Sequence, residues 1–146
     1  MPFFLAYHLH IDNKRWQRNR PGENMTILTV DPNPVESAVN RDLFEAYGHK
    51  VDTTLSADAA LAKIERNDYD LVLIEVNLPD DGGIFLCQKC AQLKPDLPVF
   101  ILTEGISVKR AIKAIKHNAV DVIFKPLDQK KLNLLEEFIT KKEEGR

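Results

Sequence analysis

The sequence lacks the features that mark secreted, membrane-spanning and nucleic-acid-binding proteins. Its 146 residues include two cysteines, too few for the disulfide framework that stabilises small secreted domains. No apolar run approaches the roughly 20 residues that cross a membrane, and the chain does not open with a positively charged start followed by an unbroken apolar segment. A net charge of −2 provides no basic excess for nucleic acid. We therefore expect a cytoplasmic protein without a membrane or nucleic-acid partner.

Composition predicts one globular domain with short additions at both ends. An apolar fraction of 44% is enough for one hydrophobic core in a chain of this length. The start of the chain differs from the rest, because an apolar and aromatic stretch is followed by basic residues around Trp16 and then by Pro21-Gly22. We expect a flexible extension over residues 1–24, a domain over 25–142 and a charged end over 143–146. A natural start at Met25 is an open alternative.

Beyond residue 25, short β-rich runs alternate with helical periodicity about five times, which is typical of βα units around a parallel sheet. The predicted strands cover residues 26–31, 50–53, 70–75, 98–103 and 120–124. Between and after them, apolar residues recur at three- and four-residue steps, as in helices that pack on a sheet. The predicted buried positions are Val35, Val39, Leu43 and Ala46; Ala57, Ala60, Leu61 and Ile64; Leu86, Cys90 and Leu93; Ala111, Ile112 and Ile115; and Leu132, Leu135 and Ile139.

Residues at the helix ends agree with this alternation. Ser56, Ser107 and Asp128 stand where the second, fourth and fifth helices are expected to begin, and their side chains are suited to capping the first turn. Gly48 follows the first helix, where glycine commonly ends one. The sequence therefore predicts where most of the helices start or stop.

Polar residues stand where four of the predicted strands end. Asp31, Glu75, Thr103 and Lys125 each close or follow an apolar run. Open α/β sheets bind ligands at the carboxyl ends of their strands, so these side chains are expected at one edge of the sheet. One polar residue at such a boundary is usually an ordinary surface residue, whereas four together predict a functional site.

The segments around these strand ends resemble the receiver domain of bacterial response regulators. The resemblance covers residues 25–142 and is specific because the order, the intervals and the strand-end placement of several motifs agree. These motifs are Val30-Asp31-Pro32-Asn33-Pro34, Asp70-Leu71-Val72-Leu73-Ile74-Glu75-Val76-Asn77-Leu78-Pro79 with Gly83, Leu102-Thr103, and Phe124-Lys125-Pro126. The resemblance implies an α/β, flavodoxin-like (βα)5 three-layer sandwich with a parallel sheet of order 2-1-3-4-5. It also implies two-component or phosphorelay signalling, in which an aspartate beside Mg²⁺ accepts a phosphoryl group from a sensor kinase.

The resemblance assigns a role to each strand-end residue. Phosphoryl transfer to a carboxylate depends on positioning and on neutralising the charge of the transferred oxygens, and Mg²⁺ takes carboxylate and carbonyl ligands. The roles are an acidic pair at Asp31 and Pro32, the phosphoacceptor at Glu75, a backbone metal ligand at Asn77, a hydroxyl donor at Thr103, a cation at Lys125 and a switch residue at Val122.

Three of these positions depart from the family pattern and predict an atypical receiver, or pseudo-receiver. Pro32 has no side-chain ligand for a metal. Glu75 is one methylene longer than aspartate, which displaces the nucleophilic oxygen by roughly 1 Å and costs on the order of a hundredfold in a positioned transfer. Val122 is stiff and has no ring to rotate, unlike the usual Tyr or Phe. We expect no enzymatic activity and no cofactor, with Mg²⁺ binding weak at the degenerate site of Asp31, Glu75 and Asn77.

The length of Glu75 suggests what the altered site does instead. Asp31, Glu75 and Lys125 sum to a charge of −1, so the site needs a metal less than one with three carboxylates does. We hypothesise that Glu75 reaches toward Lys125 and Thr103, stands in for the phosphoryl group and fixes one signalling state. In the competing interpretation, Glu75 points into solvent at a degenerate site.

Signalling is then expected to work through a partner or through dimerisation, by the fourth helix, fifth strand and fifth helix. Lys109, Arg110, Lys113 and Lys116 are predicted to point outward beside Ile106 and Val108, which favours an acidic partner although solvated basic residues are common on helices. The partners expected from the resemblance are a sensor kinase, an output domain or a second copy of the chain.

The sequence leaves other functions to weigh. In the alternative, phosphoryl acceptance is weak and Mg²⁺-dependent, at Glu75 or at the nearby Asp80 or Asp81. A small flavodoxin-like enzyme or a flavin-binding protein is a distant third possibility, because Pro32-Asn33-Pro34 lacks the glycines or the hydroxyl cluster that would cradle a phosphate. Cys87 and Cys90 resemble a redox pair or half of a zinc site, but at this spacing within a helix we expect them on or near its buried face.

Overall fold

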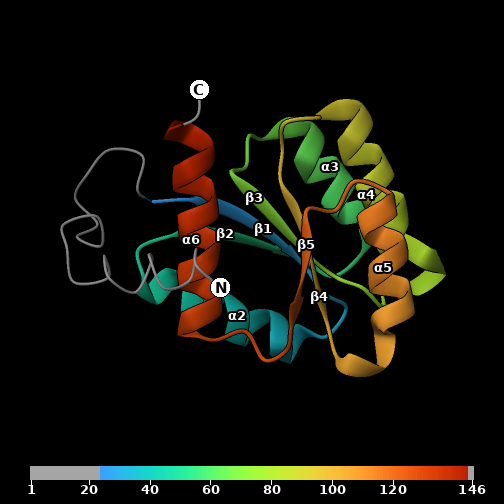
Figure 1. Ribbon diagram of the computed structural model, residues 1–146, viewed down its shortest axis with the longest axis horizontal. Coiled ribbons are helices and arrows are strands. Elements are labelled where there is room, and N and C mark those ends of the chain that lie inside the picture. Colours follow the sequence, from blue (N-terminus) through green and yellow to red (C-terminus); the bar gives the residue numbers. More distant parts are fainter. Residues whose placement is uncertain (1–23, 145–146) are drawn as a thin grey trace.

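The computed structural model describes residues 24–144, in which five parallel strands form one sheet of order β2-β1-β3-β4-β5 (Figure 1). The predicted sheet order and α/β, flavodoxin-like fold are confirmed, and each strand end lies within one residue of its prediction. The extension expected over residues 1–24 lies, apart from residue 24, outside the described residues. The strands are β1 Thr26–Val30, β2 Lys50–Thr54, β3 Leu71–Glu75, β4 Val99–Thr103 and β5 Asp121–Phe124.

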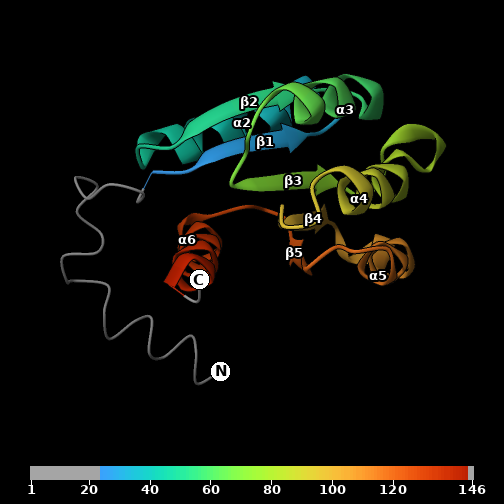
Figure 2. The same cartoon turned by 90° about the horizontal axis from the view of Figure 1, so that it is seen from above.

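Helices cover both faces of the sheet, with α2 and α6 on one side and α3, α4 and α5 on the other (Figures 1 and 2). None of the helices in the described residues is long and apolar enough to span a membrane. The last helix continues to residue 144, beyond the domain end that was expected at 142. The helices are α2 Pro34–Ala46, α3 Ala57–Arg66, α4 Gly82–Leu93, α5 Val108–Lys116 and α6 Gln129–Glu144, with short 3-10 helices η2 Pro79–Asp81 and η3 Gly105–Ser107.

The central strands are apolar on both faces because helices cover both faces. Successive side chains of a strand point to opposite sides, so Leu71 and Leu73 pack toward α2 and α6, whereas Val72 and Ile74 pack toward α3, α4 and α5. Burying each such side chain contributes roughly 1.5–3 kcal/mol. This double core fixes β3 and thereby the position of Glu75 at its end.

The helix ends confirm three of the four predictions. The Ser56 hydroxyl accepts a hydrogen bond from the Ala59 amide at 3.1 Å, and an Asp128 carboxylate oxygen accepts one from Lys131 at 3.0 Å. Gly48 follows α2 with a φ of 87°, a left-handed conformation that glycine adopts without strain. Ser107 is wrong as a side-chain cap, because its hydroxyl oxygen accepts a hydrogen bond from the Asn77 side chain instead.

Two helices bury a different stripe from the predicted one. Val35 and Val39 of α2 are 70% and 60% exposed, and Ile112 and Ile115 of α5 are 49% and 40% exposed. The predictions for Ala46 and Leu93 are likewise wrong. The physical reason is that polar and small side chains also recur at three- and four-residue steps, and close packing on the sheet favours these. In α2 the buried residues are Ser37, Asn40 and Phe44, none of which was predicted; in α5 they are Ala111, whose predicted burial is confirmed, and Ala114.

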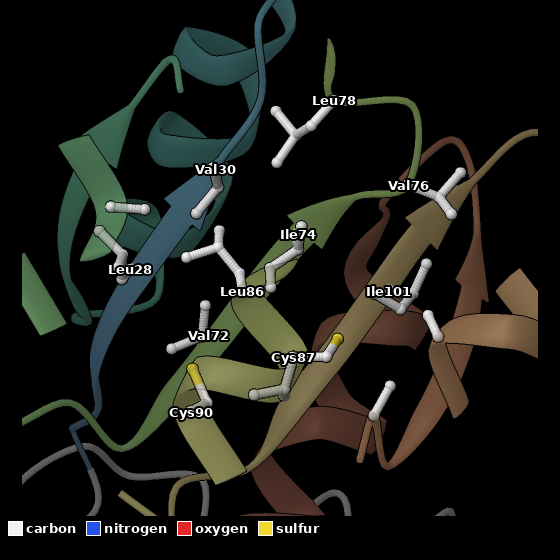
Figure 3. Packing of buried hydrophobic residues seen from close by; sticks show 14 of the residues in the cluster. Leu28, Val30, Val72, Ile74, Val76, Leu78, Leu86, Cys87, Cys90 and Ile101 are labelled. Atoms are coloured by element: carbon white, nitrogen blue, oxygen red, sulfur yellow. The ribbon is translucent and has the colours of Figure 1, made fainter. Parts of the chain in front are cut away.

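The two cysteines belong to the core. Cys87 and Cys90 are fully buried and unpaired by disulfide, and Figure 3 shows them on α4 among apolar side chains that include Val72 and Leu86. Burial raises the pKa of the Cys87 thiol to about 12 and that of Cys90 to about 11. A thiol kept protonated is a poor nucleophile and metal ligand, so the cysteines act here as small apolar side chains.

Candidate functional site

The carboxyl ends of the strands bring a carboxylate and an ammonium into direct contact. Glu75, the last residue of β3, places its Oε1 atom 2.5 Å from the Nζ atom of Lys125, which follows β5. The Glu75 side chain is 6% exposed and that of Lys125 is 11% exposed. The interpretation in which Glu75 points into solvent is therefore wrong, and the predicted reach toward Lys125 is observed.

The second carboxylate oxygen of Glu75 is also engaged. Oε2 accepts a hydrogen bond from the backbone amide of Asn77 at 2.6 Å. A charge-assisted bond of this kind is stronger than one between neutral groups. Both oxygens of the residue at the acceptor position are thus held by the protein.

Thr103 takes no part in this pairing. It is fully buried at the end of β4, and its hydroxyl donates to the backbone oxygen of Glu104 at 2.8 Å. The hypothesis that Glu75 is also bound by Thr103 is therefore wrong. The hydroxyl proton goes to the carbonyl group of the neighbouring residue, a local acceptor that the sequence pattern does not reveal.

Glu36 is a site residue that sequence reasoning missed. Its Oε2 and Oε1 atoms lie 3.1 Å and 3.3 Å from Nζ of Lys125, so one ammonium is shared by two carboxylates. Glu36 stands three residues after Asn33, which caps α2 by accepting from the Val35 and Glu36 amides. In a capping box, Glu36 would bind the Asn33 amide, but that amide donates to Asp31 at 2.8 Å, and Glu36 turns to Lys125.

Lys131 is a second residue that sequence reasoning missed. Its Nζ atom donates to the backbone oxygens of Phe124 and Pro126, at 2.5 Å and 2.8 Å. These carbonyl groups flank Lys125, so one side chain in the first turn of α6 holds the backbone on both sides of Lys125. The β5–α6 loop thus keeps the Lys125 side chain aimed at Glu75.

The charges explain the protonation behaviour of the site. Asp31, Glu36 and Glu75 surround one ammonium, so the site carries −2 when every group is ionised, rather than the −1 expected without Glu36. Burial alone lowers the pKa of Lys125, but its hydrogen bonds to Glu75 and Glu36 outweigh burial and raise the pKa above 10.5. Burial raises the pKa of Asp31, with the Asn33 amide and Lys125 opposing it.

The residues present do not make a Mg²⁺ site. Asp31 Oδ2 is buried and has no hydrogen-bond partner among the described residues, which is the one feature that favours a cation. Pro32 offers no side-chain ligand, however, and Glu75 is already neutralised by Lys125. Within residues 24–144, no three His, Cys, Asp or Glu side chains are grouped so as to hold a metal ion.

The structure also places the predicted switch residue and the two aspartates considered as alternative phosphoacceptors. Val122 is half-buried in β5 and packs against the core. Asp80 and Asp81 are exposed in η2, with φ values of 58° and 55°, a left-handed conformation that Asp tolerates better than most residues. The site therefore consists of the Glu75–Lys125 ion pair with Asp31, Glu36 and Asn77 around it.

Sequence comparisons agree on one family. The model of the response regulator receiver domain matches residues 27–135. The chain is 33% identical over 113 residues to the transcriptional regulatory protein ZraR of Klebsiella oxytoca, covering 77% of this chain and 26% of that protein. It is 30% identical over 120 residues to the two-component response regulator ARR11 of Arabidopsis thaliana, covering 81% of this chain and 23% of that protein. The chain thus spans about a quarter of the length of these curated relatives.

Solved structures show the same fold. A CheY-like receiver domain protein from Methanospirillum hungatei JF-1 superposes with a TM-score of 0.77 at 26% identity, covering 84% of this chain and 99% of that one. The beryllofluoride-activated NtrC4 receiver domain dimer superposes with a TM-score of 0.72 at 25% identity, covering 80% of this chain and 97% of that one. Both are similar to the whole sheet-and-helix unit described above.

Proposed function

Because this chain belongs to the response regulator receiver domain family, we propose that it is a pseudo-receiver of two-component or phosphorelay signalling. In this proposal it is not an enzyme, it accepts no phosphoryl group by the usual route, and it acts by binding a partner in the cytoplasm. The observation that carries the proposal is the closed ion pair between Glu75 and Lys125 at 2.5 Å.

The ion pair disfavours nucleophilic attack for two reasons. An attacking oxygen has to stand free at about 3–3.5 Å from the phosphorus atom, yet both Glu75 oxygens are bound, by Lys125 and by the Asn77 amide. Lys125 is also shared with Glu36, so the charge that would neutralise an incoming phosphoryl group is already neutralised. Glu75 therefore acts as a fixed anion in the place of a phosphoryl group.

Intact mass after incubation with acetyl phosphate and Mg²⁺ tests this proposal. We expect no phosphoryl adduct on the wild-type chain, because neither the nucleophile nor the metal site is available. A stable adduct that maps to Glu75 would overturn the proposal. An adduct at Asp80 or Asp81 would instead support the alternative of weak phosphoryl acceptance at a neighbouring acid.

The partner is proposed to bind the α5 and β5 part of the predicted face, which also included α6. Val108, Ile112 and Ile115 form an exposed apolar stripe at helical spacing, and Phe124 of β5 is also exposed. The side chain of Ile106, which was predicted to lie on this face, is outside the described part of the structure. Exposed basic residues border the stripe, namely Lys109, Arg110, Lys113 and Lys116.

Charge decides which partner fits this face. A two-fold dimer brings the same surface against itself, so the basic residues of two copies would repel across a stripe centred on Ile112. We therefore favour a protein with an apolar stripe and an acidic border, such as a region of a kinase or an output domain.

Sedimentation equilibrium tests the choice against a homodimer. The wild-type chain is expected to stay monomeric at micromolar concentrations, and Ile112→Asp is expected to leave its mass unchanged. Val35→Asp, on the exposed side of α2, is the matched control. A wild-type dimer that Ile112→Asp weakens by about thirtyfold or more, the loss expected at an interface hot spot, while Val35→Asp does not, would show that the partner is a second copy.

A further inference from the structure

A series of hydrogen bonds leads from the Glu75–Lys125 pair to α5. The backbone amide of Asn77 donates to Glu75 Oε2 at 2.6 Å. The side-chain amide of Asn77 donates to Ser107 Oγ at 2.8 Å, and its carbonyl oxygen accepts from Arg110 Nη1 at 3.3 Å. One residue thus contacts the ion pair through its backbone and the start of α5 through its side chain.

Asn77 lies between two buried residues that fix its backbone. Its neighbours Val76 and Leu78 are 4% and 1% exposed, and both belong to the core cluster that includes Ile74 and Ile101 (Figure 3). The side chain of Asn77 itself is exposed. Because buried residues are held by close packing, the loop offers the Asn77 amide as a fixed contact rather than as a mobile one.

The α5 end of the series is the start of the proposed binding face. Ser107 immediately precedes α5 and its side chain does not cap the helix, because its oxygen accepts from Asn77. Arg110 lies three residues further on, one turn along the same side of the helix. Between and beyond them, Val108 and Ile112 begin the exposed apolar stripe.

We propose that Asn77 is a positioning residue that ties the first turn of α5 to the Glu75–Lys125 pair, and so holds the α5 face in one orientation without a phosphoryl group. The inference rests on the proposed function of Glu75 as a fixed anion. It also gives the site a connection to α5 that bypasses Thr103, whose hydroxyl is bound to Glu104, and Val122, which has no ring.

Hydrogen–deuterium exchange of the α5 amides tests the tether. Asn77→Ala is expected to raise exchange over residues 112–116 by about two- to tenfold, the range for losing one hydrogen bond from a local opening equilibrium. Ser107→Ala, which removes the half-buried hydroxyl that accepts from Asn77, is expected to have a similar effect. Combining the two changes adds little, because both break the same bond.

The link to the ion pair is tested in the same experiment. Glu75→Ala is expected to raise α5 exchange in the wild-type background and to add little in the Asn77→Ala background. If Glu75→Ala does not fold, Glu75→Gln takes its place in this experiment. The effect of Glu75→Gln is expected to be smaller, because its amide oxygen can still accept a hydrogen bond from the Asn77 amide. The comparison of Asn77→Ala with Ser107→Ala tests the side-chain contact in either case.

A matched control comes from the other end of α5. Gln88 Nε2 lies 3.2 Å from His117 Nδ1, which also joins α5 to a neighbouring element. Gln88→Ala is expected to add its full effect to that of Asn77→Ala, since the two contacts are separate. Unchanged α5 exchange in Asn77→Ala, or full additivity of Asn77→Ala with Ser107→Ala or with Glu75→Ala, would overturn the tether.

The two proposals fail differently. A phosphoryl adduct on Glu75 with a responsive α5 contradicts the proposed function of Glu75 as a fixed anion, but still supports the physical link from residue 75 through Asn77 to α5. The absence of an adduct with an unresponsive α5 contradicts the tether alone.

Discussion

The double variant Pro32→Asp, Glu75→Asp is expected to accept a phosphoryl group from acetyl phosphate and Mg²⁺, with the adduct on residue 75. Pro32→Asp supplies the side-chain ligand that the metal lacks. Glu75→Asp withdraws the carboxylate by one methylene, about 1 Å, and so opens the contact with Lys125 that closes the site at 2.5 Å. Intact mass and peptide mapping measure the yield.

Each single variant is expected to label at least about a hundredfold more slowly than the double variant, because each leaves one part of the site missing. Glu36 allows a further test, because its carboxylate also forms an ion pair with Lys125. Adding Glu36→Gln to the double variant is expected to speed labelling by freeing the ammonium for the incoming phosphoryl group. Equal labelling of one single variant and the double variant would contradict the account.

Lys125→Met is expected to lower the free energy of unfolding by about 3–5 kcal/mol, because it leaves the buried Glu75 carboxylate without its cation. Urea denaturation measures the loss. Lys94→Met is the control, since Lys94 pairs with a fully exposed Asp68 and such pairs contribute under about 1 kcal/mol. Adding Glu75→Gln to Lys125→Met is expected to recover much of the loss, because the buried carboxylate in direct contact with the lost ammonium is then replaced by a neutral amide. Equal losses in Lys125→Met and Lys94→Met would contradict this part of the account.

The same pair predicts a pH dependence. The folded-state pKa of Lys125 is raised above its ordinary value of 10.5. The stabilisation is therefore fully present below pH 10.5 and is lost as the pH rises through the folded-state pKa. Wild type and Lys125→Met are expected to converge in stability only in that alkaline range.

The fold was predictable because its signals are repeated along the chain. Five apolar runs alternate with helical periodicity, and covered parallel strands need the double-sided apolar pattern seen in β3. Helix faces were less predictable. In α2, Ser37, Asn40 and Phe44 recur at three- and four-residue steps, as the predicted stripe of Val35 and Val39 does, and only packing on the sheet decides between two stripes one or two residues apart.

The site contacts that depend on strand ends could be predicted from the sequence. The contacts in which a side chain has several possible hydrogen-bond partners could not. Glu75 and Lys125 meet because parallel strands end at the same edge of the sheet. Thr103 turns to Glu104, and Glu36 turns to Lys125 after Asp31 has taken the Asn33 amide. These choices depend on distances of a few tenths of an ångström, which no spacing in the sequence encodes.

The role of Asn77 shows the same limit. Its backbone was predicted as a metal ligand from the family resemblance, whereas its side chain contacts Ser107, 30 residues further along. Contacts between separate loops follow from how the loops are mounted on the sheet. The sequence offers only an amide in one loop and a hydroxyl in another, a combination too common to carry a prediction.

The most direct test of the central claim is an amide NMR titration of the wild-type chain with beryllofluoride and Mg²⁺, beside the double variant Pro32→Asp, Glu75→Asp. If Glu75 already fills the place of the phosphoryl group, the wild-type signals of residues 75, 77, 103 and 125 stay unchanged, while those of the double variant shift and saturate. Saturable shifts of these signals in the wild-type chain would contradict the claim that the Glu75–Lys125 pair closes the site.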